Sequence, residues 1–145
     1  MVTVSQSIHI NAPVEDVFAY LDTAQNHAEV TPSLSEVRGV EALDNGGKRV
    51  EHTYKMASVG LDGELVERTH VENERMVFEM RGGLEGEIEI ETTADDGGTE
   101  LRYSAEYELP GTVLEAVATP FVRRYNEREL RTTLENTKTR LEAER

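Results

Sequence analysis

The sequence contains no cysteine and no tryptophan, only three lysines and no long apolar run. Without cysteine, the chain forms no disulfide and performs no thiolate chemistry. No apolar segment approaches the roughly 20 residues that a membrane-spanning helix needs, so no membrane span is expected. The opening residues, MVTVSQSIHI, alternate in polarity instead of placing a basic segment before an apolar one, so no secretory signal is expected. We therefore expect a soluble, cytoplasmic protein.

Positive charge is also scarce. The chain has 29 acidic residues against 15 basic ones, for a net charge of −14. This acidic composition is typical of a halophilic protein, because a salty cytoplasm screens the repulsion between like charges. Near the C-terminus the arginines alternate with glutamates, as in Arg123, Glu127 and Arg131, which indicates an ion-paired solvent face. Nucleic-acid binding, which needs a basic stripe, is not expected.

Common catalytic and cofactor motifs are missing as well. The histidines His9, His27, His52 and His70 show no HxxxH or HxH spacing, so we expect no metal site. We expect His27 and His70 to lie at the surface. The sequence has no G-x-S-x-G elbow, P-loop or dinucleotide fingerprint, and no cofactor is expected.

The N-terminal segment predicts a strand followed by two short helices. Residues 2–10 alternate apolar and polar side chains, as a half-buried strand does. Pro13 suits the first turn of a helix, whose buried face would carry the apolar residues of 14–21. A second helix is expected at Ala24–Val30, ended by Thr31-Pro32.

From residue 35 onward the pattern has a period of two and predicts six more strands. Asp44–Gly47 and Asp95–Gly98 are strong hairpin turns, because their residues tolerate positive φ. Between the third and fourth strands the turn lies at Ser58–Gly60 or at Asp62-Gly63. The predicted strands cover 35–43, 48–57, 60–71, 76–81, 84–93 and 99–109.

Two of these strands have one apolar face and one charged face. Residues 84–92 alternate mostly apolar side chains with glutamates, and in residues 101–109 apolar and aromatic side chains alternate with Arg102, Ser104, Glu106 and Glu108. This pattern is typical of an antiparallel sheet with one face in water. We interpret the acidic row Glu85–Glu91 as a solvated face; catalysis by paired carboxylates is the alternative.

The C-terminal segment predicts one long helix, Pro120–Glu144. Its larger apolar residues, including Val122, Leu130 and Leu134, recur at three-and-four spacing. A curved antiparallel sheet of about seven strands wrapped around this helix buries both apolar faces. The sequence therefore predicts a single α+β domain over residues 1–145, in the order β-α-α-β6-α.

Three stretches resemble the START-like, or SRPBCC, superfamily, and most closely its polyketide cyclase/dehydrase-like branch. They are I-H-I-N-A-P-V-E-D-V-F-A-Y-L-D at Ile8–Asp22, T-H-V-E-N-E-R-M-V-F-E at Thr69–Glu79, and R-Y-N-E-R-E-L-R-T-T-L-E-N-T-K-T-R-L-E at Arg124–Glu142. The resemblance implies the helix-grip fold, with a hydrophobic cavity between sheet and helix. Relatives hold lipids, sterols, quinones, polyketides or plant hormones there, and a few catalyse cyclisation or dehydration.

Strand parity selects candidate ligand-binding residues. His52 and Tyr54 share a face, and if that face is internal their polar tips could orient a ligand; hydrogen bonding at the sheet rim is the alternative for both. Four further residues lie on the inward parity of their strands: Phe78, Met80, Tyr103 and Tyr107. For Phe78 core filling is the alternative, whereas the buried phenols need hydrogen-bond partners.

The helical candidates lie around the start of the long helix. Asn126 falls on the path from Val122 to Leu130, where a buried amide must bond to a ligand or internally. A short helix is predicted at 112–118. The break that follows, with Val117 and Phe121, forms either a gate over the cavity or a packed bend. Tyr125 completes the ligand-binding candidates on the apolar stripe.

Three functional hypotheses remain open. The first is a non-catalytic carrier or sensor of a small hydrophobic molecule such as a lipid, polyketide or quinone-like compound. The second is a cyclase- or dehydratase-like enzyme that uses a cavity histidine or tyrosine for acid–base catalysis. The third is a protein-interaction module. We expect a monomer or a homodimer.

Overall fold

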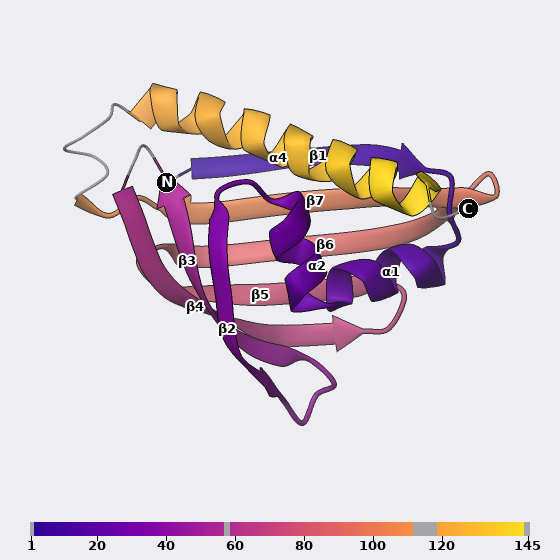
Figure 1. Ribbon diagram of the computed structural model, residues 1–145, viewed down its shortest axis with the longest axis horizontal. Coiled ribbons are helices and arrows are strands. Elements are labelled where there is room, and N and C mark those ends of the chain that lie inside the picture. Colours follow the sequence, from indigo (N-terminus) through magenta and orange to yellow (C-terminus); the bar gives the residue numbers. More distant parts are fainter. Residues whose placement is uncertain (1, 57–58, 112–118, 144–145) are drawn as a thin grey trace.

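The computed structural model describes residues 2–56, 59–111 and 119–143. One antiparallel sheet forms one layer, and three helices lie across its inner face (Figure 1). The elements are β1 (Val2–Ile10), α1 (Val14–Asp22), α2 (Ala24–Val30), β2 (Leu34–Ala42), β3 (Lys48–Met56), β4 (Val59–Val71), β5 (Arg75–Gly82), β6 (Glu85–Asp95), β7 (Gly98–Glu108) and α4 (Thr119–Ala143).

The seven strands form one sheet in the order β1-β7-β6-β5-β4-β3-β2. Each of the strands β2 to β7 pairs with the next one in sequence. The first strand, β1, pairs with the last, β7. Asp96 and Gly97 both have positive φ, as a tight turn between β6 and β7 requires. The sheet curves around the helices (Figure 1), which confirms the predicted α+β, helix-grip architecture.

The short helices lie where the sequence predicts them. In α1, Val17, Phe18 and Leu21 are buried against the sheet because the three-and-four spacing places them on one side of the helix. Helix α2 has the predicted bounds and contributes buried Val30. None of the described helices is long and apolar enough to cross a membrane.

Helix α4 runs alongside β1, as Figure 1 shows, and its apolar stripe faces the sheet. Leu130 and Leu134 are buried in the main core. Polar contacts fasten the two elements along their length: Gln6 Nε2 donates to the Glu127 carbonyl at 2.7 Å, and Lys138 Nζ donates to the His9 carbonyl at 2.9 Å. This packing supplies the stability that an isolated helix lacks.

The structure decides between the two turns predicted for the connection of the third and fourth strands. Strand β4 begins at Val59 and continues through Asp62 and Gly63, so the alternative turn at Asp62-Gly63 is wrong. Met56 and Val59 form the last pair between β3 and β4. The predicted short helix at 112–118 lies outside the described residues.

The outer face of the sheet is acidic, and arginines bridge its strands. Arg49 contacts Glu64 on the neighbouring strand at 2.6 Å, and Arg68 contacts Glu79 at 2.7 Å. These partners are partly or largely exposed, so each pair contributes little stability. The face has the solvated character that the alternating glutamates predict.

Candidate functional site

An apolar cavity of about 120 Å³ lies between the inner face of the sheet and α4. Strands of the sheet, helix α2, the α2–β2 connection and α4 all contribute to its wall. The lining residues are Val4, Ala24, His27, Thr31, Leu34, Val37, Lys48, Val50, His52, Tyr54, Leu65, Phe78, Met80, Leu84, Ile88, Tyr103, Ala105, Tyr107, Asn126, Glu129, Leu130 and Thr133. This volume is smaller than the several hundred Å³ typical of ligand pockets.

The inward face of β3 supplies four of the lining residues. Lys48, Val50, His52 and Tyr54 alternate along this strand, and all four reach the cavity. The predicted parity of His52 and Tyr54 is therefore confirmed. His52 is buried inside the wall, so the alternative position at the sheet rim is wrong for it. Burial raises the pKa of Tyr54 well above its ordinary value and keeps the phenol neutral.

The first polar pair in the cavity joins His27 of α2 to Tyr103 of β7. The His27 Nε2 atom lies 3.0 Å from the Tyr103 hydroxyl, and the rings meet edge to face. Burial, followed by the charge of Lys48, lowers the pKa of His27 to about 4, so its ring is neutral near pH 7. His27 was expected at the surface; it is half-buried and lines the cavity.

The second polar pair joins Asn126 of α4 to Tyr107 of β7. Both side chains are buried, and the Asn126 amide donates to the Tyr107 hydroxyl. Of the two alternatives left open for Asn126, a bond to a ligand or an internal bond, the structure contains the internal one. Burial raises the pKa of Tyr107, as it does for Tyr103, so both phenols remain protonated.

One polar atom in the wall lacks such a partner. The Nδ1 atom of His52 is buried and has no hydrogen bond to any residue that the structure describes. His52 itself is only 6% exposed. Burial, with a smaller contribution from Arg38, lowers the pKa of His52 and favours the neutral ring.

The other predicted candidates occupy different places. Phe78 and Met80 line the cavity and also belong to the main core. Phe121 is 69% exposed and does not line the cavity, and Tyr125 likewise lies outside its wall. The buried path of α4 passes through Val122, and a residue one position earlier points about 100° away on a helix. Val117 lies outside the described residues.

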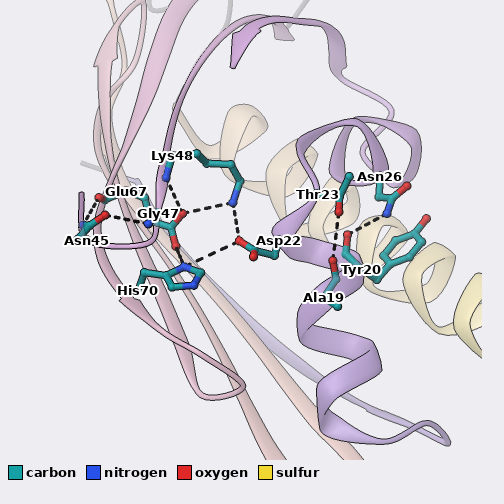
Figure 2. A network of polar contacts seen from close by, with 10 residues as sticks. All are labelled: Ala19, Tyr20, Asp22, Thr23, Asn26, Asn45, Gly47, Lys48, Glu67 and His70. Atoms are coloured by element: carbon teal, nitrogen blue, oxygen red, sulfur yellow. Dashed lines mark hydrogen bonds and ion pairs between the residues drawn. The ribbon is translucent and has the colours of Figure 1, made fainter. Parts of the chain in front are cut away.

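A buried ionic network adjoins the cavity at the end of α1 (Figure 2). The Glu67 carboxylate is fully buried; its Oε1 lies 3.3 Å from Lys48 Nζ and its Oε2 lies 2.7 Å from His70 Nδ1. Lys48 Nζ also contacts Asp22 Oδ1 at 2.7 Å. Because Asp22 ends α1, the lysine links this helix to β4. His70 was expected at the surface. Its side chain is only 13% exposed, because it pairs with the buried Glu67 carboxylate.

Backbone irregularities bring the members of this network together. The pairing of β4 with β5 shifts between Glu67 and Thr69, and this bulge places Glu67 and His70 on the same face. In the preceding hairpin, Asn45 Nδ2 donates to the Glu67 carbonyl at 2.9 Å. Gly47 packs against the Glu67 side chain, which a Cβ atom would approach to 2.8 Å. The turn therefore covers the buried carboxylate.

Asp22, Glu67 and His70 offer three atoms within 4.8 Å of one another, a grouping able to hold a metal ion. Lys48 Nζ already contacts both carboxylates of this group. The ammonium group thus supplies the positive charge that the carboxylates require, and the arrangement is that of an internal ion-pair network.

Sequence reasoning missed several polar residues at the cavity, although signals existed for two of them. His27 lies three residues from both Ala24 and Val30, on the inward side of α2. Lys48 shares the parity of His52 on β3. Glu129 reaches the wall from α4, where its Oε1 accepts from the Ser33 amide at 2.6 Å, a contact that no sequence pattern announces.

The comparisons with known proteins agree on one fold. A family model described as polyketide cyclase / dehydrase and lipid transport matches residues 1–142. A START superfamily protein from Mycobacterium smegmatis superposes with a TM-score of 0.78 at 13% identity, covering 99% of both chains. A search of curated proteins finds no match.

Two further solved structures share the fold. The di-domain aromatase/cyclase StfQ from the steffimycin biosynthetic pathway gives a TM-score of 0.79 at 14% identity, covering 99% of this chain and 51% of StfQ. The Aha1 dimer from Colwellia psychrerythraea gives 0.65 at 15% identity, covering 97% of this chain and 96% of that one. Identities this low establish likeness of fold alone.

The depressed pKa of His27 predicts an acid-sensitive fold. Between about pH 6.5 and pH 4 the unfolded chain binds a proton that the folded chain excludes, so the free energy of unfolding falls as pH falls. We expect His27→Gln to remove about 1–2 kcal/mol of the loss between pH 7 and pH 5, measured by urea denaturation. His9→Gln, at a more exposed histidine, is the control. Equal losses in wild type and His27→Gln would show that the folded protein does not hold the His27 ring neutral.

The network predicts that the charge of Lys48 is structurally required. Lys48→Met leaves two carboxylates without their shared cation and should lower the free energy of unfolding by about 3–5 kcal/mol. The same charge change at exposed Lys55 should cost less than about 0.5 kcal/mol. Adding Glu67→Gln to Lys48→Met should restore part of the loss. Similar melting temperatures for Lys48→Met and Lys55→Met would show that the network is not stabilising.

Proposed function

The chain belongs to the polyketide cyclase/dehydrase and lipid transport family, and on that premise we propose that it binds a small hydrophobic molecule of lipid, polyketide or quinone type as a non-catalytic carrier or sensor. The observation that carries this proposal is the apolar cavity between the sheet and α4. Buried apolar surface with a few polar groups is the usual composition of a small-molecule site.

The charges around the cavity support an uncharged guest. The cations and anions in the wall already have partners: Lys48 contacts Asp22 and Glu67, and Glu129 accepts from the Ser33 amide. An anionic ligand would lose its hydration and find the lysine of the wall already held by two carboxylates. The described wall is therefore better matched to a neutral molecule than to an anion.

The acid–base properties of the wall favour binding over catalysis. Burial holds the pKa of His27 at about 4, which makes its ring a weak base near pH 7. Burial also raises the pKa of Tyr103, which makes its phenol a weak acid. A general acid or base works best when its pKa lies near the working pH, and these shifts move both groups away from it.

Cyclase- or dehydratase-like catalysis is the second candidate function. The observation that favours it is the 3.0 Å contact between His27 Nε2 and the Tyr103 hydroxyl. A hydrogen-bonded imidazole and phenol facing an apolar cavity can pass a proton to a bound carbonyl compound. Turnover of a polyketide-like substrate that disappears in both His27→Gln and Tyr103→Phe would select this candidate.

Filling the cavity tests the binding proposal. Ala105 of β7 lines the cavity, whereas its neighbour Ser104 faces the opposite side of the sheet. We expect toluene to bind the wild-type protein, and ligand-observed NMR measures this binding. Ala105→Leu should weaken this binding at least tenfold because the larger side chain occupies the guest's space.

Ser104→Leu adds the same side chain outside the cavity and is the matched control. Its affinity for toluene should equal that of the wild type. If wild-type protein binds no toluene, or if Ala105→Leu binds it as tightly as Ser104→Leu does, the cavity is not the binding site.

A further inference from the structure

His52 occupies a position in the sheet where neither of the two directly paired residues carries a polar side chain. Its partner on β4 is Gly63, which has no side chain, and its partner on β2 is Val37, which is apolar. Gly63 cannot be enlarged, since a Cβ atom there would lie 2.6 Å from the Arg81 carbonyl oxygen. The ring of His52 is thus flanked in the sheet by a glycine and an aliphatic side chain.

The remaining polar groups of the wall do not complete the hydrogen bonding of His52. The Tyr103 hydroxyl is engaged with His27, and the Tyr107 hydroxyl is engaged with Asn126. The Nδ1 atom of His52 is consequently left without a partner among the described residues. Buried polar atoms are nearly always hydrogen-bonded in folded proteins, so an unpaired one on a residue of the cavity wall points to a missing guest.

The chemistry of the imidazole restricts which hydrogen-bonding group the guest can have. Burial and the nearby Arg38 lower the pKa of His52, so its ring is neutral near pH 7. In a neutral ring, Nδ1 is either a donor or an acceptor, depending on the tautomer. A hydroxyl group both donates and accepts, and it therefore satisfies Nδ1 in either state.

The size of the cavity restricts the guest further. Its volume is about 120 Å³, close to that of an engineered apolar cavity of about 150 Å³ that holds benzene. A single ring is the size of guest that fits the cavity as described. The apolar wall on either side, which includes Leu65 and Ile88, suits the faces and edges of such a ring.

We propose that the cavity selects an uncharged, ring-sized compound bearing a hydroxyl group, and that this hydroxyl bonds to Nδ1 of His52. This inference rests on the proposed binding function and adds the chemical class of the guest and the atom that recognises it. A larger ligand would place its hydroxylated ring at the same point.

Phenol and toluene test the selection directly, because they differ by a hydroxyl in place of a methyl group. After correction for their different hydration, we expect wild-type protein to bind phenol about tenfold more tightly than toluene. This preference is the effect of one net hydrogen bond. His52→Phe keeps an aromatic ring but removes the nitrogen, and should reduce the preference to about one. Glu51→Gln, on the exposed face of the same strand, should leave it unchanged.

A spectroscopic measurement on the wild-type protein removes any dependence on how the variant folds. The ¹⁵N resonance of His52 Nδ1 should shift when phenol is added and stay in place when toluene is added. Equal affinities for the two probes, or a phenol preference that survives in His52→Phe, would overturn the inference while leaving toluene binding and the proposed function intact. Failure of both probes to bind would overturn the inference and the proposed function together.

Discussion

Polar atoms that lie between the sheet and α4 need hydrogen-bond partners within the protein, because little water reaches them. This constraint accounts for much of the inner structure. Tyr107 is paired with Asn126, and Tyr103 with His27. Each pair joins a sheet strand to a helix. Hydrogen bonding in the cavity wall therefore also fixes how the helices sit on the sheet, in addition to the packing of Leu130 and Leu134.

The same constraint is met with full charges at the end of α1. Glu67 is buried, and Lys48 and His70 surround its carboxylate. A buried ion pair is weak evidence for stability by itself, since desolvation offsets much of the attraction. Its structural effect here is to hold Asp22 of α1 against β4 at one side of the cavity. Lys48 therefore both lines the cavity and holds α1 in place.

Residue patterns predicted the fold and part of the wall, and the failures have physical causes. The period of two along β3 correctly placed His52 and Tyr54 on one face, because parity fixes the face of a regular strand. Parity fails where the register shifts near Glu67, since a bulge depends on pairing with another strand. Phe121 was predicted to form a gate over the cavity or a packed bend, but it is largely exposed, and its neighbour Val122 holds the buried position. The partner of a buried charge, such as Lys48 for Glu67, depends on tertiary contacts that no local pattern encodes.

The central claim is that an apolar space remains between the sheet and α4 after the side chains have packed. Xenon tests it most directly, because this atom enters apolar cavities without needing a hydrogen bond. Diffraction from a xenon-pressurised crystal should show one strong anomalous peak between Tyr54, Ile88 and Leu130. An inner face closed by these side chains, with no xenon at that point, would contradict the account.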